Sequence, residues 1–199
     1  MPGLKVVAPS TPADAKALLL AAIRDDDPVL FLENLALYNT KGEVPDHDEP
    51  AIIGKAKVTR EGHHLTLIGY SRMAYVAKKI ADQLADTDHL DIEVIDLCSL
   101  RPLDRETIIE SVKKTSCAVV VEDDWLTYGI GAEVAATISD GAFDYLDAPV
   151  RRVAMAEVPM PYAKSLETAA LPSEDDIIQA IYQTLDAIGH RRSKTGPHD

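Results

Sequence analysis

Aromatic residues and long apolar runs are scarce in this sequence of 199 residues. Phe, Trp and Tyr make up 5% of the chain, although 46% of it is hydrophobic. A core must therefore be built from Leu, Ile, Val and Ala, which suits helices packed on a sheet better than a β-sandwich. No stretch of about 18 apolar residues occurs, so a membrane-spanning helix is not expected. Met1-Pro2-Gly3 leads directly into a strand pattern and not into a signal peptide, which predicts an α/β protein of the cytoplasm.

Cysteine is also scarce, with Cys98 and Cys117 as the two thiols of the chain. Both lie in or beside apolar, strand-like runs, where a free cysteine packs as a small hydrophobic side chain. We expect both thiols to be reduced and structural.

Basic residues are outnumbered, because 20 Lys and Arg face 33 Asp and Glu and give a net charge of −13. A phosphate backbone would be repelled everywhere except at a local basic cluster. One such cluster exists, His190-Arg191-Arg192-Ser193-Lys194 near the carboxyl end. The charge argues against nucleic acid as a partner and favours a basic protein.

The first part of the chain has the pattern of a β-α-β unit. We expect a strand at 4–8, a helix from Pro12 to about Arg24, and a strand at 29–32 that is apolar enough to be buried on both faces. The segment 35–52 is rich in acidic residues and proline and has little periodicity, which is typical of a linker. We therefore assign residues 1–34 to one domain, 35–52 to a linker, 53–189 to a second domain and 190–199 to a disordered tail.

Strand and helix patterns alternate through the second domain. Strands are expected at 55–59, 65–69, 92–97, 118–121 and 150–155, and helices at 73–85, 104–113, 131–138 and 173–188. Asp104 and Ser173 are expected to cap their helices. The alternation predicts a mostly parallel sheet covered by helices, with right-handed crossovers.

Three consecutive carboxylates, Asp25-Asp26-Asp27, follow the first expected helix. The carbonyl groups of a helix end already make the potential there negative, so the three acids repel one another. A cation held by carbonyl and carboxylate oxygens would relieve this repulsion. A solvated turn whose charges are screened by salt is the simpler alternative.

Two later segments suggest binding surfaces. The run Tyr128-Gly129-Ile130-Gly131-Ala132-Glu133 joins a strand to a helix, as anion-binding turns do, but it lacks the third glycine of a dinucleotide motif and the lysine of a P-loop. Asp144, Asp147 and Glu157 lie beside aromatic residues, which suits the rim of a protein interface as well as a solvated loop. Pro159 and Pro161 are expected to keep the connector around Tyr162 and Lys164 extended.

Several segments in order resemble one known family. They are residues 2–7, 14–16, 22–25, 53–56, 100–104, 121–122, 129–133, 146–149 and 158–164. Together they are similar to the beta subunits of the thiamine-diphosphate-dependent 2-oxo acid dehydrogenases, from residue 2 to about residue 188. The run Val158-Pro159-Met160-Pro161-Tyr162-Ala163-Lys164 favours the pyruvate enzymes over their branched-chain relatives.

The resemblance implies a fold and a missing part. It implies a three-layer transketolase C-terminal-type domain, preceded by a β-α-β remnant of the pyrimidine-binding domain. In that family the catalytic Glu and His precede the strand that matches residues 4–7, so no catalytic and no cofactor-binding residue is expected in this chain. Thiamine diphosphate and magnesium would be bound elsewhere in a heterotetramer that contains an alpha subunit and the amino-terminal half of the beta subunit.

The resemblance also implies two binding sites in this chain. The family's potassium site matches Ala22, Asp25 and Asp27, and the acid that docks the subunit-binding domain of the dihydrolipoyl acyltransferase core matches Asp147. The polar tail after Ile188 departs from the family pattern and puts a docking contact of the terminal carboxylate in doubt.

The implied function is a share in oxidative decarboxylation of a 2-oxo acid, with pyruvate favoured, and in acetyl transfer to a lipoyl group, through assembly and docking. Three alternatives stay open. They are a non-catalytic assembly module on the same fold, a beta subunit for another 2-oxo acid or for acetoin, and a nucleotide-binding regulator built on the same sheet.

Overall fold

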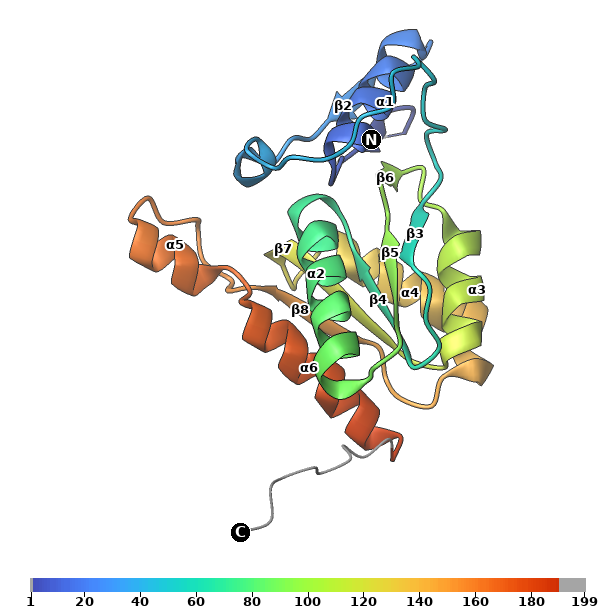
Figure 1. The fold of residues 1–199 in the computed structure, drawn as a ribbon, viewed down its shortest axis with the longest axis vertical. Helices are drawn as coiled ribbons and strands as arrows, with labels where there is room; N and C mark the ends of the chain where they lie inside the picture. Colours follow the sequence, from blue (N-terminus) through green and yellow to red (C-terminus); the bar gives the residue numbers. More distant parts are fainter. Residues whose placement is uncertain (1, 190–199) are drawn as a thin grey trace.

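The computed structural model describes residues 2–189, which form two sheets with helices packed on them. The first part is a β-α-β unit, made of β1 (Lys5–Val7), α1 (Pro12–Arg24) and β2 (Val29–Phe31), with β1 and β2 parallel. Thr11 caps α1 by accepting a hydrogen bond from the amide of Asp14, and Pro12 occupies the first turn, where its missing N–H is not needed. We call these elements, residues 5–31, the N-terminal unit (Figure 1).

A third strand joins the sheet of this unit from far along the chain. Strand β6 (Ser99–Arg101) pairs antiparallel with β1, so the order of the sheet is β2-β1-β6. Beside this pairing, the amide of Ala8 donates to the carbonyl of Cys98 at 2.8 Å. The strand was not expected from the sequence, and it fastens the N-terminal unit to the rest of the molecule.

Strand β2 is less buried than its apolar sequence led us to expect. Leu30 within the strand is 46% exposed, and Leu32 just after it is 39% exposed. Strand β2 forms the edge of the sheet, so its side chains lack neighbours on one side. The expectation of a strand buried on both faces is therefore wrong.

The second sheet has five strands in the order β3-β5-β4-β7-β8. They are β3 (Lys57–Arg60), β4 (Leu65–Gly69), β5 (Ile92–Asp96), β7 (Ala118–Trp125) and β8 (Arg151–Met155). All neighbours pair in parallel except β3, which runs antiparallel to β5 at one edge. This confirms the mostly parallel sheet.

Helices cover both faces of the second sheet and complete the three layers. Helices α2 (Ser71–Asp88) and α6 (Glu174–Ala187) enclose one core with the inward side chains of the strands. Helices α3 (Arg105–Thr115) and α4 (Ile130–Ala142) enclose the other. Leu65 and Leu67 of the central strand face the first core and Ile68 faces the second, as the alternation of side chains along a strand requires.

Both expected helix caps are present. The side chain of Asp104 accepts a hydrogen bond from the amide of Thr107 at the start of α3. Ser173 and Asp176 form a reciprocal capping box at the start of α6. Both local motifs begin their helices where the sequence placed them.

Three short elements were not expected, in addition to β6. They are the 3-10 helices η1 (Leu35–Leu37) and η2 (Phe143–Tyr145), and helix α5 (Lys164–Ala170). The connector before α5, residues 156–163, has no regular secondary structure and contains bends, so the expected extended run is not confirmed. Tyr162 is fully exposed, and Lys164 begins the helix. Helix α5 projects to one side of the second sheet (Figure 1). The expected tail, residues 190–199, lies outside the described residues.

Candidate functional site

The acids that follow α1 are paired with an internal cation. The Nζ of Lys5 lies 2.7 Å from Oδ1 of Asp25 and 3.1 Å from Oδ2 of Asp27. The amide of Asp27 also donates to Oδ1 of Asp25 at 2.9 Å. The hydrogen bond from Lys5 lowers the pKa of Asp25, and the two carboxylates raise the pKa of Lys5. Part of the repulsion that suggested a cation is thus relieved by the chain itself.

Ala22 lies in the last turn of α1, where it could offer a cation its backbone carbonyl oxygen but no side-chain ligand. The three residues of the expected potassium site, Ala22, Asp25 and Asp27, therefore lie at one helix end, with Lys5 beside the two acids. Carbonyl and carboxylate oxygens are suitable ligands for a hard cation. The potassium site stays a prediction.

Asp147 is exposed and lies two residues after the end of η2. Its amide donates to the carbonyl of Ser116 at 2.9 Å, which fixes the backbone while the carboxylate faces solvent. Phe143 and Tyr145 nearby are 72% and 52% exposed. The arrangement has the composition of an interface rim, with an acid beside accessible aromatic rings.

The glycine-containing turn before α4 holds an acid of the chain itself. Glu122 at the carboxyl half of β7 is fully buried, and its Oε2 accepts a hydrogen bond from the amide of Gly131 at 2.7 Å. Its Oε1 accepts from Nη2 of Arg152, also at 2.7 Å. A Cβ atom on Gly129 or Gly131 would overlap the Glu122 carboxylate, so both glycines serve this packing. The helix end is occupied by Glu122, which argues against the nucleotide-binding alternative.

A buried polar cluster that sequence reasoning missed joins the two sheets. We call it the junction cluster: Ser10, Asp14, Lys57, Asp96 and Cys98. The hydroxyl of Ser10 donates to the carboxylate of Asp96, and the ammonium of Lys57 bonds the carboxylate of Asp14. The amide of Cys98 donates to Oδ1 of Asp96 at 3.0 Å. Ser10, Asp14, Asp96 and Cys98 are each at most 4% exposed, whereas the side chain of Lys57 is half exposed.

Burial dominates the electrostatics of the junction cluster. It raises the pKa of Asp96 to about 6, against the opposing effect of the hydrogen bonds from Ser10 and Cys98. Burial also raises the pKa of the Cys98 thiol far above its usual range. For Lys57, burial opposes the charged form, but the hydrogen bond to Asp14 and the nearby negative charges together outweigh it, so the pKa is raised. The cluster thus keeps Lys57 charged and favours a proton on Asp96.

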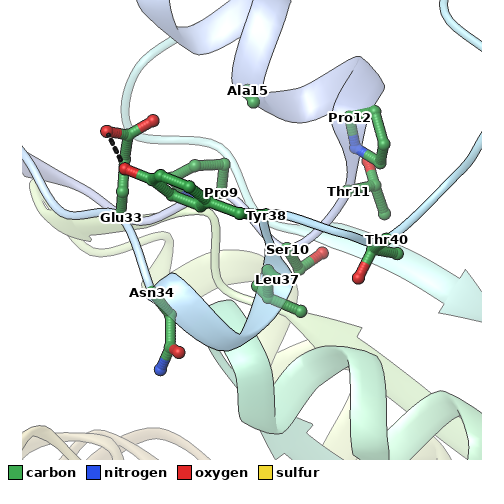
Figure 2. A pocket seen from close by; sticks show the side chains of 10 residues that line it. All are labelled: Pro9, Ser10, Thr11, Pro12, Ala15, Glu33, Asn34, Leu37, Tyr38 and Thr40. Carbon is green, nitrogen blue, oxygen red and sulfur yellow. Dashed lines mark hydrogen bonds between the residues drawn. The ribbon is translucent and has the colours of Figure 1, made fainter.

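Two pockets are lined in part by residues of the junction cluster. One, of about 280 Å³, opens between the start of α1 and η1 and is lined by Ser10 together with Glu33 and Tyr38, whose hydroxyl donates to Oε2 of Glu33 at 3.0 Å (Figure 2). The other, of about 340 Å³, is lined in part by Lys57 and Cys98. Each pocket therefore borders at least one residue of the cluster.

The sequence does contain one indication of the junction cluster, namely polar residues at or after the ends of two strands. Asp96 ends β5, which is apolar except for Glu93, and Ser10 follows the first strand within a few residues. Polar groups at the carboxyl ends of parallel strands often gather at one edge of a sheet. The signal indicates a polar edge but not which residues meet there.

Helices long and apolar enough to cross a bilayer are not found in the part of the chain that the structure describes.

Two family models match the chain. The model described as "Transketolase, C-terminal domain" matches residues 54–177, and the model described as "Transketolase, pyrimidine binding domain" matches residues 1–41. The two matches are consecutive and together include most of the chain.

Curated relatives carry the name "Pyruvate dehydrogenase E1 component subunit beta". The protein from Rickettsia conorii is 51% identical over 181 residues, which are 91% of this chain and 55% of that protein. The mitochondrial protein from Dictyostelium discoideum is 48% identical over 184 residues, which are 90% of this chain and 51% of that protein. The chain spans about half the length of these relatives.

A solved structure described as "Split gene transketolase, inactive beta4 tetramer" has the same fold. It superposes with a TM-score of 0.75 at 24% identity and covers 94% of this chain and 59% of its own. At this identity the likeness concerns the fold alone.

Proposed function

Because the chain belongs to the transketolase C-terminal domain family and is similar over nine-tenths of its length to pyruvate dehydrogenase E1 beta subunits, we propose that it acts as the carboxyl-terminal part of such a subunit. In this role it contributes to the oxidative decarboxylation of pyruvate and the transfer of the acetyl group to a lipoyl group. The 51% identity to the Rickettsia protein carries the proposal.

The fold supports a role in assembly. Strand β6 and the junction cluster hold the N-terminal unit against the carboxyl edge of the second sheet. The unit exposes apolar side chains on α1 and β2, including Ile23 at 73% and Leu30 at 46%. Exposed apolar surface of this kind is suited to further protein contacts. The proposed partners are the alpha subunit and the amino-terminal half of the beta subunit.

We propose that the described residues hold no site for thiamine diphosphate or its magnesium ion. Their buried carboxylates already have partners within the chain: Asp14 bonds Lys57, Glu93 bonds Lys114, Asp96 bonds Ser10, Asp104 bonds Thr107 and Glu122 bonds Arg152. We therefore place catalysis and cofactor binding outside this chain, and assign it no catalytic step.

Two binding roles are part of the proposal. Ala22, Asp25 and Asp27 would hold a structural potassium ion at the end of α1, supported by the oxygen-rich helix end. Asp147 would receive a basic subunit-binding domain of the dihydrolipoyl acyltransferase, supported by its exposure and by the net charge of −13. A cytoplasmic location remains a prediction.

Reconstitution tests the function. The chain is mixed with an alpha subunit and a polypeptide that carries the amino-terminal half of a beta subunit, and thiamine-dependent decarboxylation of pyruvate is measured. Activity should require all three polypeptides. The mixture without this chain is the control.

The substrate and the assembly are read separately in the same mixture. Activity on a branched-chain 2-oxo acid or on acetoin, without activity on pyruvate, would show that this compound and not pyruvate is the substrate. Formation of a complex by size exclusion, with no activity on any of these substrates, would favour the non-catalytic assembly module.

A further inference from the structure

The junction cluster connects two separately formed parts of the fold. Ser10 and Asp14 belong to the N-terminal unit, on the loop after β1 and on α1, whereas Lys57 and Asp96 belong to β3 and β5 of the second sheet. Each of the two side-chain contacts, Ser10 to Asp96 and Lys57 to Asp14, crosses from one part to the other. Any change in the charge of the cluster therefore acts on the attachment of the unit.

The cluster holds two carboxylates but a single cation in direct contact. Asp14 has Lys57 as its counter-ion and also accepts from the hydroxyl of Thr11 at 2.6 Å. Asp96 accepts hydrogen bonds from neutral groups, the hydroxyl of Ser10 and the amide of Cys98. An ionised Asp96 would thus be a buried charge without its own ion pair, which is costly in a medium of low dielectric constant.

Among the residues that the structure describes, no second cation is in contact with Asp96. From α1 it faces the negative charge of Asp14, from β3 the ammonium of Lys57 that already bonds Asp14, and from its own strand end the Cys98 thiol. Lys55, His47 and Glu49 line the pocket on the side of Lys57 and Cys98. Separation of the N-terminal unit would expose Asp96 to water, where its ionisation costs nothing extra.

We propose that the junction cluster is a proton-sensitive latch, which holds the N-terminal unit on the second sheet most tightly when Asp96 is protonated and less tightly when Asp96 is ionised. The latch depends on the described fold and not on the proposed enzymatic role. The raised pKa of Asp96, about 6, places the change between mildly acidic and neutral pH. The sign follows from linkage, because the attached form binds the proton more strongly than the separated form.

The reactivities of the two cysteines report separately on the junction and on the core. Cys98 lies at the junction and is 2% exposed, whereas Cys117 lies in the core under α2 and α6 and is fully buried. Cys117 lies just before β7, at the amino ends of the parallel strands, whereas Asp96 lies at the carboxyl end of β5. Loosening of the latch should therefore expose Cys98 and leave Cys117 protected.

The test labels the full chain with a small thiol reagent under native conditions and follows each cysteine by peptide mass spectrometry. The rate for Cys117 reports global unfolding, which also releases Asp96. The rate for Cys98 divided by the rate for an unstructured cysteine peptide in the same buffer cancels the ordinary effect of pH on thiol reactivity. Between pH 5 and pH 7.5 this ratio should rise, by up to about tenfold if separation fully restores the ordinary pKa of Asp96. A ratio that does not change with pH would overturn the proposal.

Substitutions assign the effect to Asp96. Asp96→Asn keeps the shape and can still accept from the amide of Cys98, while its NH2 group donates to the hydroxyl of Ser10. The variant cannot ionise, so its labelling ratio should be flat within about twofold across the same range, in contrast to the tenfold rise derived from linkage. Glu93→Gln removes another buried carboxylate of β5 that lies away from the junction. The labelling ratio of this variant should still rise with pH. A rise of equal size in Asp96→Asn would reject Asp96 as the switch.

If Asp96→Asn does not fold, a second variant tests the same proposal. Ser10→Ala removes the hydroxyl that stabilises the ionised form of Asp96. The rise in the labelling ratio should then continue to a higher pH than in the unsubstituted chain. An unchanged pH profile in Ser10→Ala would count against the latch.

Discussion

Glu122 and Gly131 lie nine residues apart in the sequence, and the carboxylate of the one accepts a hydrogen bond from the amide of the other at 2.7 Å. The contact gives the positive end of α4 a negative group from the preceding strand. Arg152 from β8 balances the same carboxylate. A strand, a helix and a neighbouring strand are thereby joined by one buried acid.

Substitution of this acid should be strongly destabilising. Glu122→Ala leaves the mostly buried side chain of Arg152 without its counter-ion, and the free energy of unfolding should fall by about 3 to 5 kcal/mol. Urea unfolding measures the loss. Asp124→Ala, at an exposed position on the same strand, is the control and should change the free energy by no more than about 0.5 kcal/mol. Equal losses in the two variants would refute a special role for Glu122.

The raised pKa of Asp96 predicts how stability depends on pH. The value is about 6 in the folded protein, against 3.8 for an ordinary aspartate. Stability from protonated Asp96 is therefore fully present below pH 4 and is lost as pH rises through 6. Asp96→Asn should not show this loss, so it should gain about 1 to 3 kcal/mol over the unsubstituted chain between pH 4 and pH 7. Urea unfolding at several pH values checks the difference, and a constant difference would contradict the assignment.

The proposed docking role of Asp147 predicts a loss of affinity. Asp147→Ala removes an exposed carboxylate without changing the backbone hydrogen bond to Ser116, so folding should be preserved. Binding to a basic subunit-binding domain, measured by calorimetry with the assembled enzyme, should weaken by about tenfold, in line with a lost contact of 1 to 2 kcal/mol. Asp144→Ala, another exposed acid nearby, is the control. Unchanged affinity for Asp147→Ala would reject it as the docking acid.

The proposed potassium site predicts a specific salt effect. A bound ion stabilises the folded form by mass action, so the melting temperature should rise with potassium at constant ionic strength. The same concentrations of tetramethylammonium, which is too large to enter such a site, provide the control. Asp27→Asn should reduce the response. A melting temperature that does not distinguish the two cations would argue against a bound ion and leave Lys5 as the cation of this helix end.

Much of the architecture could be predicted from the sequence, because its causes are local. The apolar strands around Leu67 and Val119 alternate with helical patterns, and the caps at Asp104 and Ser173 each depend on residues within one turn. Strand β6 could not be predicted, because its three residues become a strand through pairing with β1, more than 90 residues earlier. Tertiary pairing, and not intrinsic preference, determines such short strands.

The candidate sites show the same difference between local features, which the sequence reveals, and contacts between distant residues, which it does not. The acids after α1 and the exposed Asp147 were visible in the sequence because each is a local feature. The junction cluster was not, since Ser10 and Asp96 are 86 residues apart and meet through the packing of the two sheets. The partner of Asp25 and Asp27, Lys5, was missed for the same reason, because it reaches them from the start of β1.

The placement of β6 affects how such a protein can be rearranged in evolution. The strand leaves the second sheet after β5 and supplies an outer strand to the first sheet. Exchange of the N-terminal unit for that of a distant homologue would bring a new β1 to an old β6, and the two edges would have to match in register and in twist. Recombination at the linker is therefore constrained by a strand encoded well beyond it, so the heritable module is larger than either sheet.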